Sequence, residues 1–169
     1  LWGDFSNDGY LDFAISASTT GNPGIRFTKL LRNVSGVLTE DPNLPFVNRI
    51  GFLHAVDYDN DSDLDLFVRR DVFENDLGNF SEDLATNLPE GAIYNVGDYD
   101  NDGDSDVFLD PDEPGAWSRF YRYEGGVFIE DASTTSPIFH GGATSLADTD
   151  GDGDLDLAIT YFVGDIPVL

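Results

Sequence analysis

The chain has 169 residues, and 33 acidic residues against 8 basic ones give it a formal net charge of −25 at pH 7. This charge argues against nucleic acid as a partner, because phosphate backbones are bound by basic surfaces. Apolar residues make up 40% of the sequence and aromatic residues 13%, which excludes a disordered acidic tail and predicts a folded chain.

The first predicted element is an aspartate ladder, DFSNDGYLD from Asp4 to Asp12, which we call loop 1 and number as positions 1 to 9. An apolar run over 13–15 follows, and its unbroken apolarity predicts a strand buried on both faces. A hairpin over 27–39 comes next, with the alternation and turn glycine typical of half-exposed strands. A proline-rich linker over 41–45 closes this first repeat.

The same order of elements returns along the chain, with ladders that start 53, 41 and 50 residues apart at Asp4, Asp57, Asp98 and Asp148. The second repeat has an opening run at 52–56, the ladder DYDNDSDLD from Asp57 (loop 2), an apolar run at 64–68 and a hairpin at 72–80. The third has an opening run at 92–97, the ladder DYDNDGDSD from Asp98 (loop 3), an apolar run at 107–109 and a hairpin at 119–129. The fourth has an opening run at 143–147, the ladder DTDGDGDLD from Asp148 (loop 4) and an apolar run at 155–159. This period is near that of a four-stranded propeller blade, and no helical periodicity longer than a turn interrupts it. We expect one segment, 1–169, with repeats at about 1–48, 49–91, 92–141 and 142–169, of which the first and last are incomplete.

The ladders have the spacing of calcium loops, because a hard divalent cation takes six to eight oxygen ligands. Side chains at positions 1, 3, 5 and 9 and the backbone carbonyl at position 7 can supply these ligands if the chain curls around the ion. The curl needs a left-handed residue at position 6, where Gly9, Gly103 and Gly153 stand. Ser62 replaces glycine in loop 2 at a cost of about 1 kcal/mol, so this loop is either strained or differently wound. Loop 1 has Ser6 at position 3 and is expected to bind most weakly.

Position 12 distinguishes the kind of calcium loop, because the helix–loop–helix type needs a bidentate glutamate there. Ile15, Val68, Leu109 and Ile159 stand at this position, so the loops lead into buried strands. The alternative interpretation is that these segments are solvated acidic turns. Four matches with one spacing favour calcium, and we expect the ion to be structural, since it holds together carboxylates that would otherwise repel one another.

These ladders, their strand context and the repeat length resemble the FG-GAP or VCBS type repeats, whose best-known members form the calcium-binding blades of the integrin alpha β-propeller. The resemblance covers essentially the whole chain. The Phe-Gly and Gly-Ala-Pro signature itself is absent, with Gly51-Phe52 and Gly141-Gly142-Ala143 nearby, so the pattern is similar to the bacterial-style version of the repeat.

The resemblance implies an all-β fold of propeller blades with up to four calcium ions, one in each loop. The metal-ligand side chains that it implies are Asp4, Ser6, Asp8 and Asp12; Asp57, Asp59, Asp61 and Asp65; Asp98, Asp100, Asp102 and Asp106; and Asp148, Asp150, Asp152 and Asp156. Backbone carbonyls of Tyr10, Asp63, Asp104 and Asp154 would add the position-7 ligand.

A closed ring of about seven such blades needs roughly twice this length. We therefore expect about three and a half four-stranded blades of a larger propeller, whose open edges pair with the rest of the propeller or with another chain. The absence of methionine indicates a processed chain or a part of a longer one. No apolar stretch approaches the ~18 residues of a membrane span, so no transmembrane segment is expected.

The function expected from these features is extracellular, on the cell surface or secreted: a calcium-stabilised, non-enzymatic module for adhesion to or recognition of protein or glycan. One alternative is an accessory propeller of a large secreted enzyme that acts on polysaccharide, and another is an architectural repeat in a surface fibre. Catalysis has little support, because no nucleophile elbow, phosphate-binding glycine loop or zinc histidine pair is present.

For the other candidate residues we prefer a structural interpretation to a functional one. His54 stands where the sister repeats have Asn95 and Ser145, which indicates a generic polar strand position, and His140 lies in a linker. A stripe of basic and aromatic residues could stack a sugar, although packing of an outer strand explains it as well. The stripe consists of Arg119, Tyr121, Arg122 and Tyr123. Trp2 and Trp117 are interpreted as core or blade-edge aromatics.

Overall fold

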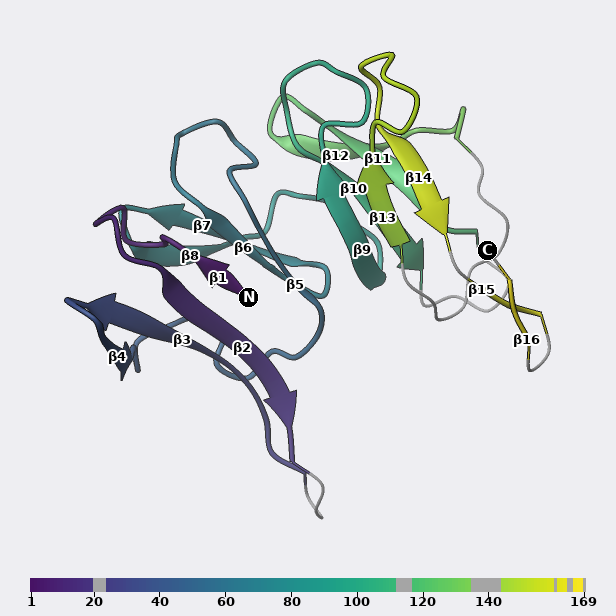
Figure 1. Ribbon diagram of the computed structural model, residues 1–169. Coiled ribbons are helices and arrows are strands. Elements are labelled where there is room, and N and C mark those ends of the chain that lie inside the picture. Colours follow the sequence, from purple (N-terminus) through teal and green to yellow (C-terminus); the bar gives the residue numbers. More distant parts are fainter. Residues whose placement is uncertain (20–23, 112–116, 135–143, 160, 164–165, 169) are drawn as a thin grey trace. The chain divides into compact units, whose positions relative to one another are not determined.

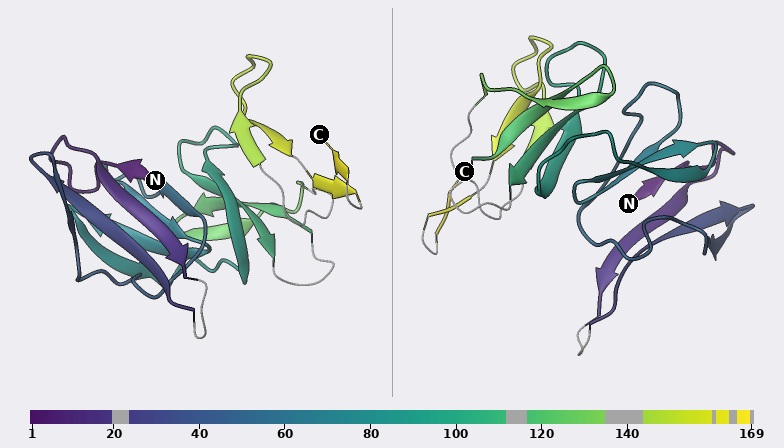
Figure 2. Two further views of the ribbon diagram at one scale, coloured as in Figure 1. Left: turned by 60° about the horizontal axis from the view of Figure 1, so that its bottom comes forward. Right: turned by 180° about the vertical axis from the view of Figure 1, so that it is seen from behind.

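The structure is a computed structural model that describes residues 1–19, 24–111, 117–134, 144–159, 161–163 and 166–168. Within these residues the protein is all-β, with strands, turns and no helix, as Figures 1 and 2 show. This part of the chain therefore has no helix that is long and apolar enough to cross a membrane. The prediction of an all-β fold is confirmed.

The strands follow one another in short hairpins along the sequence. Their bounds are β1 Trp2–Gly3, β2 Asp12–Ser18, β3 Arg26–Val34, β4 Val37–Glu40, β5 Leu53–Val56, β6 Asp65–Val68, β7 Asp71–Asp76, β8 Asn79–Asp83, β9 Gly91–Gly97, β10 Asp106–Pro111, β11 Arg119–Glu124, β12 Val127–Glu130, β13 Thr144–Ala147, β14 Asp156–Ile159, β15 Tyr161–Val163 and β16 Ile166–Val168.

The chain divides into two compact units, residues 1–84 and 85–169. The first unit holds two four-stranded sheets, ordered β1-β2-β3-β4 and β5-β6-β7-β8. The second unit holds the sheet of β9 to β12 and the two hairpins β13-β14 and β15-β16. Within each sheet or hairpin, strands that adjoin in sequence pair in the antiparallel sense, so each four-stranded sheet is a simple meander (Figure 1).

The four aspartate ladders occupy the first connection of their sheets or hairpins. Loop 1 joins β1 to β2, loop 2 joins β5 to β6, loop 3 joins β9 to β10, and loop 4 joins β13 to β14. The strand after each ladder begins at the position-9 aspartate. The sheets thus hold all four loops in the same structural context.

Two of the strands that follow a ladder are buried along the stretch that the sequence marks as apolar. All four residues of β6 are buried, and so are residues 106–110 of β10. Both strands lie inside their sheets, with a hydrogen-bonded neighbour on each side. In β14, which pairs with β13 in a two-stranded sheet, exposed and half-buried residues alternate instead.

The core of the first unit lies between its two sheets. Ala14 and Leu30 from the first sheet pack in one cluster with Leu66, Val68 and Phe73 from the second. The predicted linker over 41–45 also enters this core through Leu44, and the next residue but one, Phe46, belongs to the same cluster. The Phe46 ring lies 5.2 Å from the Phe73 ring and 5.3 Å from the Phe80 ring, both in edge-on arrangements.

In the second unit the buried side chains come mainly from the sheet of β9 to β12. Ile93, Val107 and Leu109 are fully buried, and the Phe108 ring lies 4.9 Å from the Phe120 ring. The Phe120 ring also lies 4.3 Å from Tyr99, the position-2 residue of loop 3. Aromatic packing in the sheet therefore reaches the start of the loop.

Candidate metal centres

Each loop winds around the carboxylate at position 1. In loops 1 to 3 one oxygen of this carboxylate accepts the N–H of position 5 and the other accepts the N–H of position 6. The distances are 3.1 and 2.8 Å at Asp4, 3.0 and 3.0 Å at Asp57, and 3.1 and 3.1 Å at Asp98. In loop 4 Asp148 accepts from Gly151 at 2.6 Å and from Gly153 at 3.1 Å.

The winding places two left-handed residues in every loop. Position 6 has φ values of 86° at Gly9, 77° at Ser62, 98° at Gly103 and 99° at Gly153. Loop 2 is therefore wound like its sisters, and Ser62 has a backbone conformation that an L side chain rarely adopts. Position 4 is left-handed too, at Asn7, Asn60, Asn101 and Gly151.

The position-9 aspartate fastens each loop to its sheet. Asp12, Asp65 and Asp106 are at most 1% exposed. In each, Oδ2 accepts the N–H of position 2 at 3.1 Å, and Oδ1 accepts a backbone N–H from the third strand of the sheet. The third-strand donors are Asn33 in β3 at 2.7 Å, Asn75 in β7 at 2.8 Å and Tyr123 in β11 at 2.9 Å. In loop 4 the N–H of Thr149 makes the position-2 bond to Asp156 at 3.0 Å.

Burial makes two of these carboxylates, those of Asp65 and Asp106, costly to ionise without a cation. It raises the pKa of Asp65 to about 7 and the pKa of Asp106 to about 6, against the opposing effect of their backbone hydrogen bonds. The neighbouring carboxylates of Asp59 and Asp61 raise the pKa of Asp65 further. A cation bound in the loop would lower these pKa values by favouring the charged carboxylates.

Three loops bring three carboxylates close enough to hold a metal ion. The groups are Asp57, Asp59 and Asp61; Asp98, Asp100 and Asp106; and Asp148, Asp150 and Asp156; within each, one oxygen per residue lies within 4.8 Å of the others. Position 9 belongs to the groups of loops 3 and 4, and position 5 to that of loop 2. Among the described residues loop 1 forms no such group. The donors are all carboxylate oxygens, which suit hard cations.

Neighbouring loops are linked by the asparagine at position 4. The side-chain amide of Asn7 donates to Asp63 in loop 2, and that of Asn101 donates to Asp154 in loop 4 at 2.5 Å. Asp63 also accepts the N–H of Leu77 at 2.6 Å, so both oxygens of its carboxylate already have a partner. The carboxylate of Asp63 therefore holds the loop in place, and the ligand that the sequence predicts at position 7 is the backbone carbonyl.

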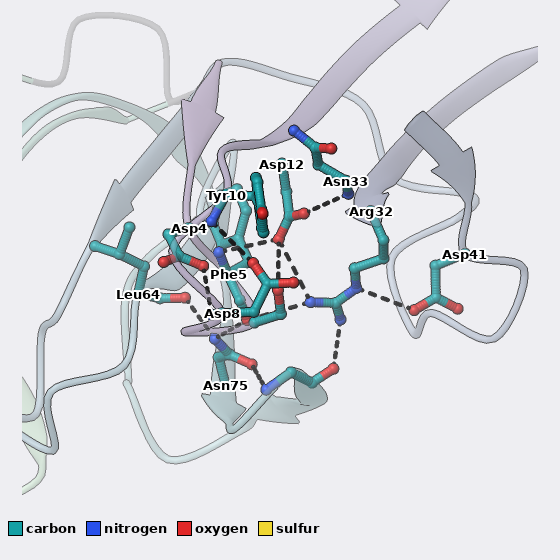
Figure 3. A network of polar contacts seen from close by, with 12 residues as sticks. Asp4, Phe5, Asp8, Tyr10, Asp12, Arg32, Asn33, Asp41, Leu64 and Asn75 are labelled. Atoms are coloured by element: carbon teal, nitrogen blue, oxygen red, sulfur yellow. Dashed lines mark hydrogen bonds and ion pairs between the residues drawn. The ribbon is translucent and has the colours of Figure 1, made fainter. Parts of the chain in front are cut away.

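Loop 1 is held by a network of polar contacts that the sequence did not predict (Figure 3). The guanidinium of Arg32 donates to the carbonyl of Phe5 at 3.2 Å and to Asp41 at 3.4 Å, and lies 3.8 Å from Asp12. The buried side-chain amide of Asn75 donates to the carbonyls of Phe5 and Leu64 at 3.0 and 2.9 Å. Loops 1 and 2 are thus joined through β7.

Two tyrosines at position 2 brace their loops against the end of the sheet. The hydroxyl of Tyr58 donates to Asp83 at 2.9 Å, and that of Tyr99 donates to Asp131 at 2.7 Å. The side-chain hydrogen bond from Ser133 and the one from Tyr99 lower the pKa of Asp131. A sequence pattern could have predicted these bonds: a tyrosine at position 2 recurs together with an aspartate five residues after the outer-turn glycines Gly78 and Gly126.

The basic and aromatic stripe packs within β11, the third strand of its sheet, between β10 and β12. Tyr121 is 6% exposed, Arg119 pairs with Glu130, and the Tyr123 ring lies 5.1 Å from Phe128. These contacts agree with the packing interpretation of the stripe.

The structure places three of the four remaining candidate residues. His54 is half-buried in β5 opposite Phe67, and His140 lies outside the described residues. Trp2 and Trp117 are 56% and 45% exposed, so neither belongs to the core. The Trp2 ring packs 4.6 Å from the Phe13 ring at the sheet edge.

Comparisons with protein-family models, with curated proteins and with solved structures found no match to this chain.

The strain at Ser62 predicts opposite effects for a reciprocal pair of variants. Ser62→Gly should raise the free energy of unfolding by about 1 kcal/mol, because glycine adopts the left-handed conformation without a Cβ penalty. Gly103→Ser should lower it by a similar amount, since no atom lies within 4 Å of a Cβ added there and the cost is conformational. Urea unfolding at fixed free calcium measures both, and equal signs for the two variants would contradict the account.

Proposed function

We propose that this protein is a calcium-binding β-propeller segment that recognises or adheres to protein or glycan outside the cell, without catalytic activity of its own. The observation that carries the proposal is the set of three aspartate groups, each of which stands in an identically placed loop. The shared winding, with left-handed residues at positions 4 and 6, supports one ligand-binding purpose for all of these loops.

Calcium is the cation that suits this donor set best. Calcium takes six to eight oxygens in flexible geometry, whereas magnesium demands a near-ideal octahedron and keeps several waters. A loop with carboxylates at positions 1, 3, 5 and 9 and a carbonyl at position 7 offers that many oxygens. Extracellular calcium modules work at ~10⁻⁴ to 10⁻³ M, which favours a secreted or cell-surface location.

The calcium would be structural. Loops 2, 3 and 4 carry five aspartates each, and those that group together have oxygens within 4.8 Å of one another. Like charges at such distances oppose folding, and a divalent ion among them removes the repulsion. Cation binding and loop closure would therefore be one event.

The repeated sheets support a propeller. Three four-stranded antiparallel meanders follow one another in the sequence, each with its ladder in the first connection. Four-stranded meanders of this kind are the blades of propellers, and a ring of about seven would need roughly twice this chain. The open edges would then pair with the rest of the propeller or with another chain.

The structural roles of the ladder aspartates favour recognition over catalysis. The position-1 carboxylates hold the loop backbone, and those of position 9 hold the sheet. A carboxylate that also binds calcium has a lowered proton affinity, which suits a general acid poorly. Rigid loops on one side of each blade would leave other loops to present a fixed surface to a partner.

Calorimetric titration of the chelator-stripped chain with calcium tests the metal proposal. We expect saturable binding at loops 2, 3 and 4, weakest binding at loop 1, and a large rise in melting temperature. Each site should add about 2.7 kcal/mol of stability when free calcium exceeds its Kd a hundredfold. The triple variant Asp57→Asn, Asp98→Asn and Asp148→Asn should lose most of the heat and of the shift. A folded chain that binds no calcium at millimolar concentration would refute the proposal.

Binding of the fluorescent chain to a glycan array and to extracellular matrix proteins tests the recognition proposal. We expect binding to at least one ligand in calcium, with loss of binding in chelator, because the presenting surface depends on closed loops. The calcium-binding triple variant is the matched control. If the calcium-loaded chain binds nothing while its loops are filled, recognition is wrong and an architectural role is favoured.

A further inference from the structure

One side-chain position beside the loops carries charges of opposite sign in different repeats. It is the residue immediately before the third-strand N–H that binds the position-9 aspartate, and we call it the tuning position. The position holds Arg32 in β3, Glu74 in β7 and Arg122 in β11. Because the hydrogen bonds to Asp12, Asp65 and Asp106 match, the three side chains occupy equivalent places next to loops 1, 2 and 3.

At loop 1 the tuning position places a cation against the ladder (Figure 3). Nη1 of Arg32 lies 3.8 Å from Oδ2 of Asp12 and 3.2 Å from the carbonyl oxygen of Phe5. The Arg32 side chain is 15% exposed, so water screens this charge only partly. Loop 1 has three aspartates, against five in each of the others, and the guanidinium balances one of their charges.

Loops 2 and 3 form a nearly matched pair with opposite charges at this position. Both carry aspartate at positions 1, 3, 5, 7 and 9. At loop 3 Nη1 of Arg122 lies 3.7 Å from Oδ2 of Asp100, a member of the carboxylate group there, and 2.5 Å from Glu124. At loop 2 the residue is Glu74, so that ladder gains a negative charge.

The carboxylates around Glu74 agree with its placement beside the negative ladder of loop 2. Its burial raises its pKa, and the carboxylates of Asp59, Asp83, Asp61 and Asp76 raise the pKa further. Asp59 and Asp61 are two members of the carboxylate group of loop 2. Glu74 therefore adds to the negative potential that a cation in loop 2 would meet.

We propose that the charge at the tuning position sets the order in which the loops take calcium, with loop 2 tighter than loop 3 and with loop 1, whose negative charge Arg32 partly balances, the weakest. This inference rests on the proposed function, namely that the ladders bind calcium. The physical basis is Coulombic: a fixed positive charge near the ligands repels a divalent cation and competes for the same oxygens, whereas a negative charge attracts it.

The experiment exchanges the two charges and measures each loop separately. In the ¹⁵N-labelled full chain, the amide of the position-6 residue reports calcium binding in its own loop, at Gly9, Ser62 and Gly103. Glu74→Arg should weaken calcium binding at loop 2 about tenfold, and Arg122→Glu should tighten it at loop 3 about tenfold. The neutral variants Glu74→Gln and Arg122→Gln should move the affinities in the same directions by about threefold. All four changes should shrink as salt rises.

The opposite signs separate a charge effect from a packing effect. If these side chains only packed, every substitution would weaken binding, irrespective of its charge and of salt. Arg122→Glu should also lower the melting temperature of the metal-free chain while it tightens calcium binding, a combination that lost packing does not produce. If Glu74→Arg does not fold, the two glutamine variants and Arg122→Glu decide the question alone.

A further variant tests the claim for loop 1. Arg32→Gln should lower the stability of the metal-free chain and shift the Gly9 amide at about threefold lower calcium than in the wild type. If wild-type loops 2 and 3 bind calcium but the affinities ignore these substitutions, the tuning role alone is overturned. If no loop of the wild type binds calcium, the proposed function fails and the tuning role fails with it.

Discussion

Each of the first three repeats depends on the buried aspartate at position 9. Its two oxygens join three pieces of backbone that are separate in the sequence: the start of the loop, the strand that follows it and the third strand of the sheet. A buried carboxylate needs such partners, because an unpaired charge in the interior costs several kcal/mol. Closure of the loop and formation of the sheet therefore depend on hydrogen bonds to the same carboxylate.

The buried aspartate at position 9 also makes closure of the loop electrostatically unfavourable. Closing a loop gathers further carboxylates near a buried charge, and the raised pKa values of Asp65 and Asp106 record the cost of doing so without a cation. Two guanidinium groups supply positive charge beside the ladders, that of Arg32 at loop 1 and that of Arg122 at loop 3. In loops 2, 3 and 4, which carry five aspartates each, a bound divalent ion would supply further positive charge. The need for an ion therefore increases with the negative charge of the loop.

Much of the fold could be predicted from the sequence, because strand, turn and ladder signals are local. The left-handed conformation at position 6 follows from glycine in three of four ladders, and position 4 carried a similar signal in Asn7, Asn60 and Asn101 that went unused. The sequence left the conformation of loop 2 undecided, because serine at position 6 is compatible both with a strained left-handed residue and with a different winding. The pairing of Asn7 with Asp63, 56 residues apart, and the place of Arg32 beside Asp12 depend on how sheets pack and on strand register, which no local pattern specifies.

A crystal structure of the chain grown in millimolar calcium would show whether the ladders hold metal ions. We expect an ion in each of loops 2, 3 and 4, with side-chain oxygens of the ladder and the carbonyl oxygen of position 7 at about 2.3–2.6 Å. Anomalous scattering would identify each ion as calcium. The account would be contradicted by loops with the same winding and the same hydrogen bonds at position 9 that hold no ion under those conditions.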